Sequence, residues 1–195
     1  MIREMEGDLV LMFQLNHLFD LLENLEEGVE ELEKKIKEQA EPFMKEIEIL
    51  TSMKGISVLI AISIIADIIK VDRFKDSKSF TSYLRSAPRV ESSNTTKGNK
   101  GTNKMGRKLS ATLLTQVLNH VLAASPKLDK WYTRLTTYKK AGSIRTGLRR
   151  RVFAEIYQML KKEKYHYGRD LKKHEEKLNQ YKIFLEKRKN LLKSA

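Results

Sequence analysis

The chain has 195 residues, of which 41% are hydrophobic, enough for one domain and an accessory element but too few for a large multidomain enzyme. It contains no cysteine, which excludes disulfides, thiolate metal sites and a cysteine nucleophile and favours a reducing cytoplasm. The longest apolar run, Val58 to Ile69, is shorter than the roughly twenty residues of a membrane span and contains Asp67, so we expect no membrane segment.

The net charge of +13 is unevenly distributed along the chain. Residues 1–50 hold five basic and fourteen acidic residues, whereas residues 51–195 hold 33 basic and 11 acidic ones. A positive surplus of that size attracts polyanions, which makes nucleic acid the leading ligand of the larger part. The acidic part must therefore have a different partner.

The N-terminal segment has the pattern of a coiled coil. Its apolar residues recur at alternating steps of four and three, at Leu11, Leu15, Leu18, Leu22, Leu25, Val29, Leu32 and Ile36. The phase slips near Pro42, where a proline would kink or restart a helix. We predict a coiled-coil arm over residues 1–50, in two helical pieces, and homo-oligomer formation through residues 9–50; the alternative is an amphipathic helix packed on its own domain.

A small turn precedes the apolar run. Gly55, Ile56 and Ser57, with Ala61 four positions later, resemble the second half of a helix-hairpin-helix motif, although Ser57 stands where that motif usually has glycine. Free N–H groups at such a helix start bind a DNA phosphate without reading sequence. The pattern predicts either a DNA contact at Gly55, Ile56 and Ser57 or a plain turn between helices. Ser57 could instead act as the N-cap, which would satisfy one of these N–H groups and hinder close approach of a phosphate.

Further helices follow in chain order. We predict them over residues 58–69, from near Asp76 or Ser77 to Leu84, over 109–124, 128–140 and 143–164, with a basic helical tail extending beyond Tyr165. No strand pattern is present. The expected fold is mainly α, with an arm (residues 1–50), a compact helical domain (51–165) and a basic C-terminal helix or tail (166–195).

The segment from Arg85 to Lys108, which we call the basic segment, reads as a long polar loop with three glycines. It contains a single acid, Glu91, against a set of cations expected to contact phosphate: Arg89, Lys97, Lys100, Lys104, Arg107 and Lys108. It also contains Ser92 and Ser93. Clustered cations could stabilise a phosphodiester under attack by a serine, but no base is visible, and serines are ordinary in turns.

Smaller signals complete the pattern. Arg149, Arg150 and Arg151 begin a helical turn and are expected either to meet a phosphate backbone or to form a solvated face. Aromatic residues beside basic ones would stack nucleic-acid bases or pack in the core; they are Trp131, Tyr132, Tyr138, Tyr165 and Tyr167. The four histidines show no ligand spacing, so we expect no metal and no cofactor bound by this chain.

Five segments, taken in order and spacing, carry a family resemblance over about residues 50–165. They are Met53–Ser57, Arg73–Lys78, Pro88–Ser93, Lys104–Arg107 and Gln158–Lys161. Together they resemble the C-terminal transposase domain of the DEDD-type insertion-sequence transposases, bacterial recombinases guided by a bridge RNA. The acidic coiled coil resembles the arm that joins two domains and mediates assembly in that family.

The resemblance implies a role for single residues. In that family a serine five residues after the proline attacks a DNA phosphate and becomes covalently linked to it; the position here is Ser93, with Ser92 as the fallback. Asn94 follows Ser93 where the family usually has glycine, and Arg85–Pro88 stands in place of Gly-Leu-x-Pro. Lys104, Gly106 and Arg107 match the following motif and imply phosphate contact and positioning of the next helix.

The family also has an N-terminal RuvC-like nuclease domain whose carboxylates hold magnesium, and residues 1–50 do not resemble it. Magnesium is therefore expected only in a partner RuvC-like domain supplied in trans. We expect little or no strand transfer by this chain alone, which would be a truncated or decaying copy, a domain acting with a partner, or a protein kept for binding. Its expected partners are DNA and a structured guide RNA. The rival hypothesis is a non-catalytic, self-associating helical protein that binds nucleic acid.

Overall fold

The structure, a computed structural model, describes residues 2–87 and 105–193, and every regular element in this part of the chain is a helix. The predicted mainly α fold is confirmed. The chain divides into two units, Met1–Gln39 and Ala40–Ala195. The elements are α1 (Ile2–Gln39), η1 (Glu41–Phe43), α2 (Met44–Thr51), α3 (Val58–Ile68), η2 (Val71–Arg73), α4 (Ser77–Tyr83), α5 (Leu109–Ala124), α6 (Pro126–Thr136), α7 (Ala141–Lys162) and α8 (Leu171–Lys193).

The first unit is the single long helix α1. The apolar residues of its predicted seam, from Leu11 to Ile36, are all exposed. Ion pairs one turn apart stabilise the helix locally, with Nζ–Oε distances of 2.8 Å for Lys34–Glu30 and 2.7 Å for Lys35–Glu31. The apolar side chains of α1 therefore lack a covering partner within the described part of their own unit.

The helix is interrupted where the heptad pattern of apolar residues changes phase. Helix α1 ends at Gln39, Pro42 lies in the 3-10 turn η1, and α2 starts at Met44. This confirms the prediction of two helical pieces. Residues 40–50, which the sequence analysis grouped with the arm, lie in the second unit, where Ile47 and Leu50 are fully buried.

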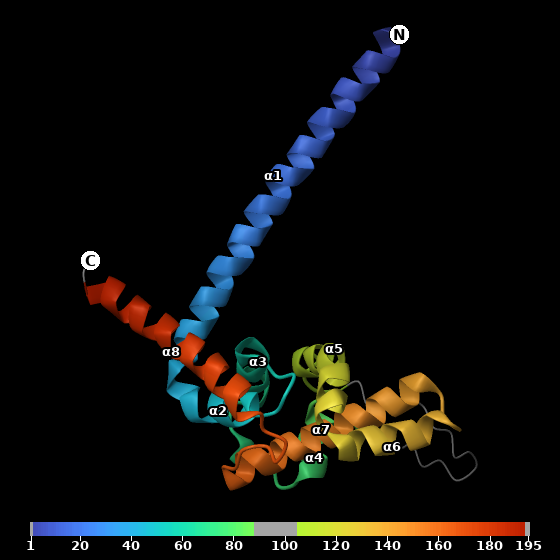
Figure 1. Ribbon diagram of the computed structural model, residues 1–195, viewed down its shortest axis with the longest axis vertical. Coiled ribbons are helices and arrows are strands. Elements are labelled where there is room, and N and C mark those ends of the chain that lie inside the picture. Colours follow the sequence, from blue (N-terminus) through green and yellow to red (C-terminus); the bar gives the residue numbers. More distant parts are fainter. Residues whose placement is uncertain (1, 88–104, 194–195) are drawn as a thin grey trace. The chain divides into compact units, whose positions relative to one another are not determined.

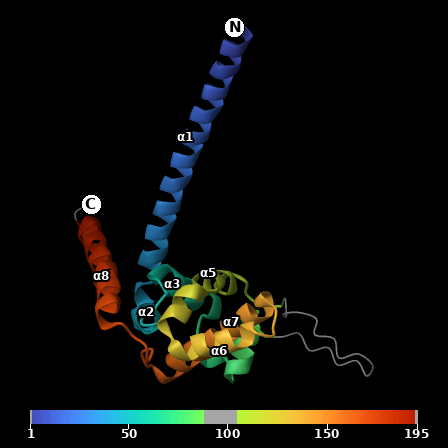
Figure 2. The same cartoon turned by 45° about the vertical axis from the view of Figure 1, so that its right-hand side comes forward.

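Helix α7 forms the centre of the second unit. It packs against α2, α4, α5 and α6, and in both ribbon views its long orange helix runs beside α6 (Figures 1 and 2). Its buried face carries Leu148, Val152, Phe153 and Ile156, all fully buried. Phe80 of α4 packs on Phe153 with ring centroids 6.4 Å apart. The packing of these helices around α7 therefore fixes the positions of the loops that are attached to α4, α5 and α7.

Local capping explains most helix boundaries. Asp76 caps α4 through a reciprocal capping box with Ser79, and Ser125 caps α6 by accepting a hydrogen bond from the N–H of Leu128. Helix α5 spans the predicted residues, and α3 ends one residue before the predicted end. Residues 141 and 142, which the sequence left between the predicted helices 128–140 and 143–164, belong to the first turn of α7.

The sequence predicted a basic C-terminal helix or tail extending out from the domain, and the structure has a helix, α8, that packs on the rest of the second unit. Leu178, Tyr181 and Leu185 are buried, and burial raises the pKa of Tyr181 to about 12. The buried His174 places its Nε2 atom 2.9 Å from the carbonyl oxygen of Glu48, and burial lowers its pKa. Lys177 donates to the carbonyl oxygen of Ile56 (3.0 Å). Helix α8 is thereby fixed to the turn that precedes α3.

Candidate nucleic-acid interface at the ends of the basic segment

Six predicted site residues lie outside the described residues because the structure describes nothing between residues 87 and 105. They are Arg89, Ser92, Ser93, Lys97, Lys100 and Lys104. The described candidates are the two ends of the basic segment, the turn at Gly55–Ser57, and the arginines at 149–151. The candidate site therefore consists of the residues that hold the segment's two ends.

The two ends of the basic segment meet beside the C-terminus of α4. The N–H of Arg107 donates to the carbonyl oxygen of Tyr83 (2.9 Å), and Nε of Arg85 donates to the carbonyl oxygen of Gly106 (2.7 Å). Gly106 has a φ of +105°, and a Cβ atom there would lie 2.1 Å from the Tyr83 oxygen. Only glycine fits this junction without displacement of the backbone.

Arg149 of α7 holds the N-terminal end of the segment. Its Nε donates to Oγ of Ser86 (3.0 Å) and its Nη2 to the carbonyl oxygen of Arg85 (2.9 Å). Its Nη1 donates to Oγ1 of Thr115 on α5 (3.0 Å). Burial lowers the pKa of the guanidinium. All three guanidinium nitrogens thus bond to the protein, so this arginine joins α7, α5 and the segment rather than presenting a free charge.

A cluster of two exposed arginines and a tyrosine, which we call the Tyr83 cluster, lies next to this junction. Hydrogen bonds from Arg107 and, to a lesser extent, Arg73 lower the pKa of the Tyr83 hydroxyl, and the same contact raises the pKa of Arg107. The Arg73 guanidinium also lies 4.8 Å from the centre of the Tyr83 ring. Arg107 is followed by the exposed Lys108, so positive charge gathers where the segment leaves the core.

A buried carboxylate fixes the start of α5. Asp67 of α3 accepts hydrogen bonds from the N–H (2.9 Å) and Oγ (2.6 Å) of Ser110. The carboxylate is 7% exposed and satisfies one of the donors left open at a helix N-terminus. Helix α5 starts at Leu109, directly after Lys108, and its second residue is thereby held at a fixed point, which positions the C-terminal end of the basic segment.

The turn at Gly55–Ser57 joins α2 to α3. Gly55 has a φ of +95°, and a Cβ atom there would lie 3.1 Å from the Cβ of His120 on α5. Ile56 is fully buried, whereas Ser57 is exposed and accepts a hydrogen bond from the N–H of Ile60. Ser57 is thus the N-cap of α3, one of the two roles that the sequence allowed, and it occupies one of the N–H groups that a phosphate would use.

The other two arginines of α7 differ from Arg149. Arg150 is half-buried and Arg151 is exposed, with its guanidinium 4.3 Å from the centre of the Trp131 ring of α6. A cation held over an indole keeps its charge accessible to an anion. Three consecutive arginines therefore have three different environments.

Two other kinds of site are absent from residues 2–87 and 105–193. This part of the chain contains no group of three or more His, Cys, Asp or Glu side chains that could hold a metal ion. None of its helices is both long enough and apolar enough to cross a membrane.

Comparison with known families adds a finding that the geometry alone does not give. Residues 47–133 match the model of the transposase family IS116/IS110/IS902. The match runs from α2 into α6, covers somewhat less than half of the chain, and includes the whole basic segment. No curated protein and no solved structure matches the chain. The family match supports the predicted resemblance to a transposase C-terminal domain and a transposition-related function.

Within this transposase-like region, sequence reasoning missed three residues that shape the site. The sequence placed Tyr83 only within the helix that ends at Leu84, Arg73 only in a family motif, and Asp67 only in an apolar run. Their partners lie 10 to 43 positions away in the sequence and on other elements, so no local spacing indicates them. A charge inside an otherwise apolar helix was the one available signal, and it pointed to Asp67.

Proposed function

We propose that the chain is a DNA-binding transposase domain that takes part in DNA transposition and site-specific recombination through Ser93, with Ser92 as the fallback nucleophile. The observation that carries the proposal is the family match over residues 47–133, which contains the basic segment. The described ends of that segment support it, because Gly106, Arg85 and Arg149 hold both ends against the core while Arg107 and Lys108 remain exposed.

The proposed reaction is an exchange of phosphodiester bonds. The Oγ–P bond of Ser93 forms as a bond from phosphorus to a deoxyribose oxygen breaks, the departing oxygen takes up a proton, and the serine proton passes to a base. The cations of the basic segment would stabilise the charge that develops on the phosphoryl oxygens. We propose that a RuvC-like partner domain supplies the base and the magnesium, and that this chain is incomplete without it.

The described residues supply a DNA-binding face for this reaction. In the proposal, Arg107, Lys108 and Arg73 contact the phosphate backbone beside the reacting position, and Gly55–Ser57 contacts a second phosphate. A structured guide RNA would direct the domain to its DNA target in the bacterial cytoplasm.

Replacement of the serine tests the proposed chemistry. In a reaction supplemented with a RuvC-like partner domain and magnesium, Ser93→Ala is expected to abolish the covalent protein–DNA product, because alanine has no nucleophilic oxygen. The product is measured with end-labelled DNA on a denaturing gel. DNA affinity, measured by fluorescence anisotropy, should stay at the wild-type value and fall steeply with added salt.

Ser92→Ala is the matched control, since it removes a hydroxyl one position away and should leave the product intact. If Ser93→Ala retains the product and Ser92→Ala loses it, the nucleophile is Ser92. Unchanged product after both replacements would overturn the catalytic proposal and favour the non-catalytic nucleic-acid-binding protein.

We also propose that the protein self-associates through the arm. The repeat from Leu11 to Ile36 places exposed apolar side chains along α1 at the spacing of a coiled-coil seam, and an uncovered apolar stripe of that length is unusual in a monomer. The charged residues of the two ion pairs, Lys34–Glu30 and Lys35–Glu31, occupy positions outside this seam.

If the arm mediates self-association, charged residues placed in its apolar seam should dissociate the oligomer. Leu18→Glu combined with Leu25→Glu should convert the oligomer to a monomer, because buried glutamates would face one another. The control is His17→Glu combined with Asn24→Glu, which adds the same charge one position before each seam residue and should leave the oligomer intact. Sedimentation velocity gives the mass, and an unchanged mass in the seam variant would contradict the proposal.

A further inference from the structure

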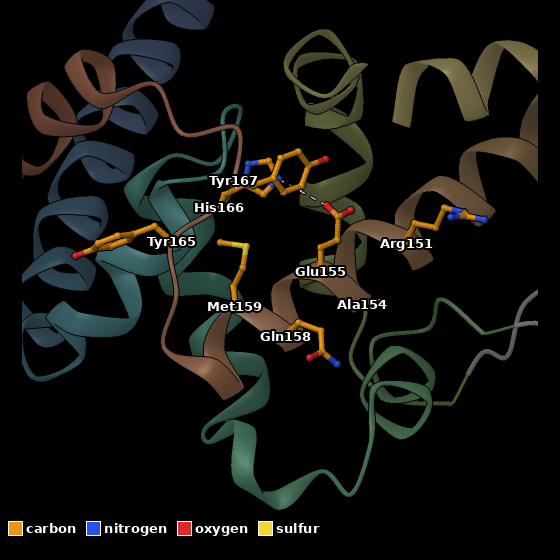
Figure 3. Close-up of a pocket in the computed structure, with 8 residues that line it drawn as sticks. All are labelled: Arg151, Ala154, Glu155, Gln158, Met159, Tyr165, His166 and Tyr167. Carbon is orange, nitrogen blue, oxygen red and sulfur yellow. Dashed lines mark ion pairs between the residues drawn. The ribbon is translucent and has the colours of Figure 1, made fainter. Parts of the chain in front are cut away.

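A pocket of about 400 Å³ lies between the C-terminal half of α7 and the segment that follows it, residues 163–170 (Figure 3). We call it the α7 pocket. Its polar lining comes from Arg151, Glu155 and Gln158 on α7, and its aromatic lining from Tyr165, His166 and Tyr167. It lies outside the residues that match the transposase family.

The wall formed by residues 165–168 is fixed from several sides. The N–H of His166 donates to Oγ of Ser52 (2.9 Å), and the Tyr167 hydroxyl lies 2.6 Å from Oγ of Ser125. The N–H of Gly168 donates to Nδ1 of His166 (3.1 Å). Because Nδ1 accepts this bond, Nδ1 carries no proton. The ring proton of the neutral imidazole is therefore on Nε2, which is a hydrogen-bond donor.

Two buried polar atoms of the pocket have no hydrogen-bond partner in the described part of the chain. They are Nε2 of His166 and Oε2 of Glu155, 3.7 Å apart, too far for a hydrogen bond between them. His166 is only 4% exposed. Figure 3 shows Glu155 reaching from α7 toward His166 and Tyr167. Buried donors and acceptors are nearly always satisfied, so an adjacent donor and acceptor left open here indicate a missing partner.

The chemistry of the pocket selects among possible partners. A planar ring would find an aromatic face in Tyr167, whose side chain is largely exposed and lies 4.3 Å from His166 between ring centroids. The Glu155 carboxylate can accept hydrogen bonds from two adjacent N–H groups of a ligand. The Nε2–H of His166, beside it, can donate to a carbonyl oxygen next to those two groups. Guanine presents this order on one edge, with the N2 amino group, N1–H and O6. Arg151 also lines the pocket, and its exposed guanidinium over Trp131 supplies a positive charge for the attached phosphate.

We propose that the α7 pocket binds a single unpaired guanine of RNA or single-stranded DNA. Glu155 accepts from N1–H and the N2 amino group, His166 donates to O6, Tyr167 stacks on the base, and Arg151 contacts the phosphate. A paired guanine is rejected because this edge is used in the duplex. The inference does not depend on Ser93, so it can fail while the proposed transposase function stands, and the reverse.

The test measures discrimination between strands. The full chain is titrated with labelled 12-nucleotide oligo(U) and with the same strand carrying one central guanine, both as RNA and as the corresponding DNA. We expect the guanine to increase affinity roughly tenfold, the value of one or two charge-assisted hydrogen bonds. Strands with a central adenine or cytosine, and the guanine strand annealed to its complement, should show no such increase. An increase in both RNA and DNA means that the base is read, and an increase in RNA alone means that the ribose contributes as well.

Glu155→Gln should remove this guanine preference while leaving the affinity for the strand without guanine nearly unchanged. Glu175→Gln is the matched control, because it makes the same charge change at an exposed position of α8 and should keep the preference. Thermal unfolding of both variants verifies that they are folded. Equal wild-type binding of the two strands, or a Glu155→Gln effect that is the same on both, would overturn the proposal and leave Glu155 and His166 as a structural pair bridged by water.

Discussion

Gly106→Ala is expected to lower the free energy of unfolding by about 2 kcal/mol or more, because the residue has a φ of +105° that side chains rarely adopt. The new Cβ would also lie 2.1 Å from the Tyr83 carbonyl oxygen, so the backbone must move. That movement would disrupt the Arg107–Tyr83 and Arg85–Gly106 hydrogen bonds that close the basic segment. DNA affinity should therefore fall together with stability.

The matched control is Gly142→Ala in the first turn of α7, where a Cβ would meet nothing within 4 Å. Alanine favours the helix there, so a gain of a few tenths of a kcal/mol is expected. Urea unfolding followed by circular dichroism measures both variants, and fluorescence anisotropy measures DNA affinity. Equal stability of the two variants would show that the junction at Gly106 tolerates a side chain.

Arg149→Met is expected to cost on the order of 3 kcal/mol, since it removes three hydrogen bonds from a charged donor and leaves Ser86 and Thr115 with lost partners. Arg149→Lys should recover little of this stability, because an ammonium group cannot reach three acceptors in the geometry of a guanidinium fork. Both variants release the N-terminal end of the basic segment. DNA affinity should therefore fall by more than the loss of one charge explains in Arg149→Met, and should fall in Arg149→Lys although the charge is kept.

Arg145→Met separates geometry from charge. Arg145 lies one turn earlier on α7, is exposed, and loses the same charge on replacement. It should leave the free energy of unfolding within about 0.5 kcal/mol of the wild type and reduce DNA affinity only slightly. Indistinguishable affinities of the Arg145 and Arg149 variants would mean that Arg149 acts through its charge, and would contradict the anchoring role.

The local part of the fold was predictable because it depends on neighbours in the sequence. The apolar period and the capping residues located α3 and α5, and Pro42 located the break after α1. Packing was less predictable. The lysine-rich composition of residues 166–195 indicated a helix or tail that extends outward, but a sparse stripe with Tyr181 and Leu185 is enough to bury one face of α8.

The site was predictable only where a motif carried it. The basic segment stands out in the sequence, and Gly106 and Arg107 do lie at its anchored end. The roles of Arg149 and Asp67 were not predictable, because their partners are 34 to 64 residues away and come together only through packing. The α7 pocket was equally hidden, since Glu155 lies in the middle of a regular helix and gives no local signal.

The anchor on Arg149 also has a consequence for the order of events during protein synthesis. Residues 85, 86 and 106 leave the ribosome before Arg149 is made, and Arg149 is separated from Arg85 by 64 positions. Contacts of such large separation form late, after the intervening chain has been closed into a loop at an entropic cost. A nascent chain that has not yet completed α7 therefore exposes a strongly basic stretch whose N-terminal end lacks its anchor. Completion of a distant helix, rather than translation of the stretch itself, is the step that fixes this end.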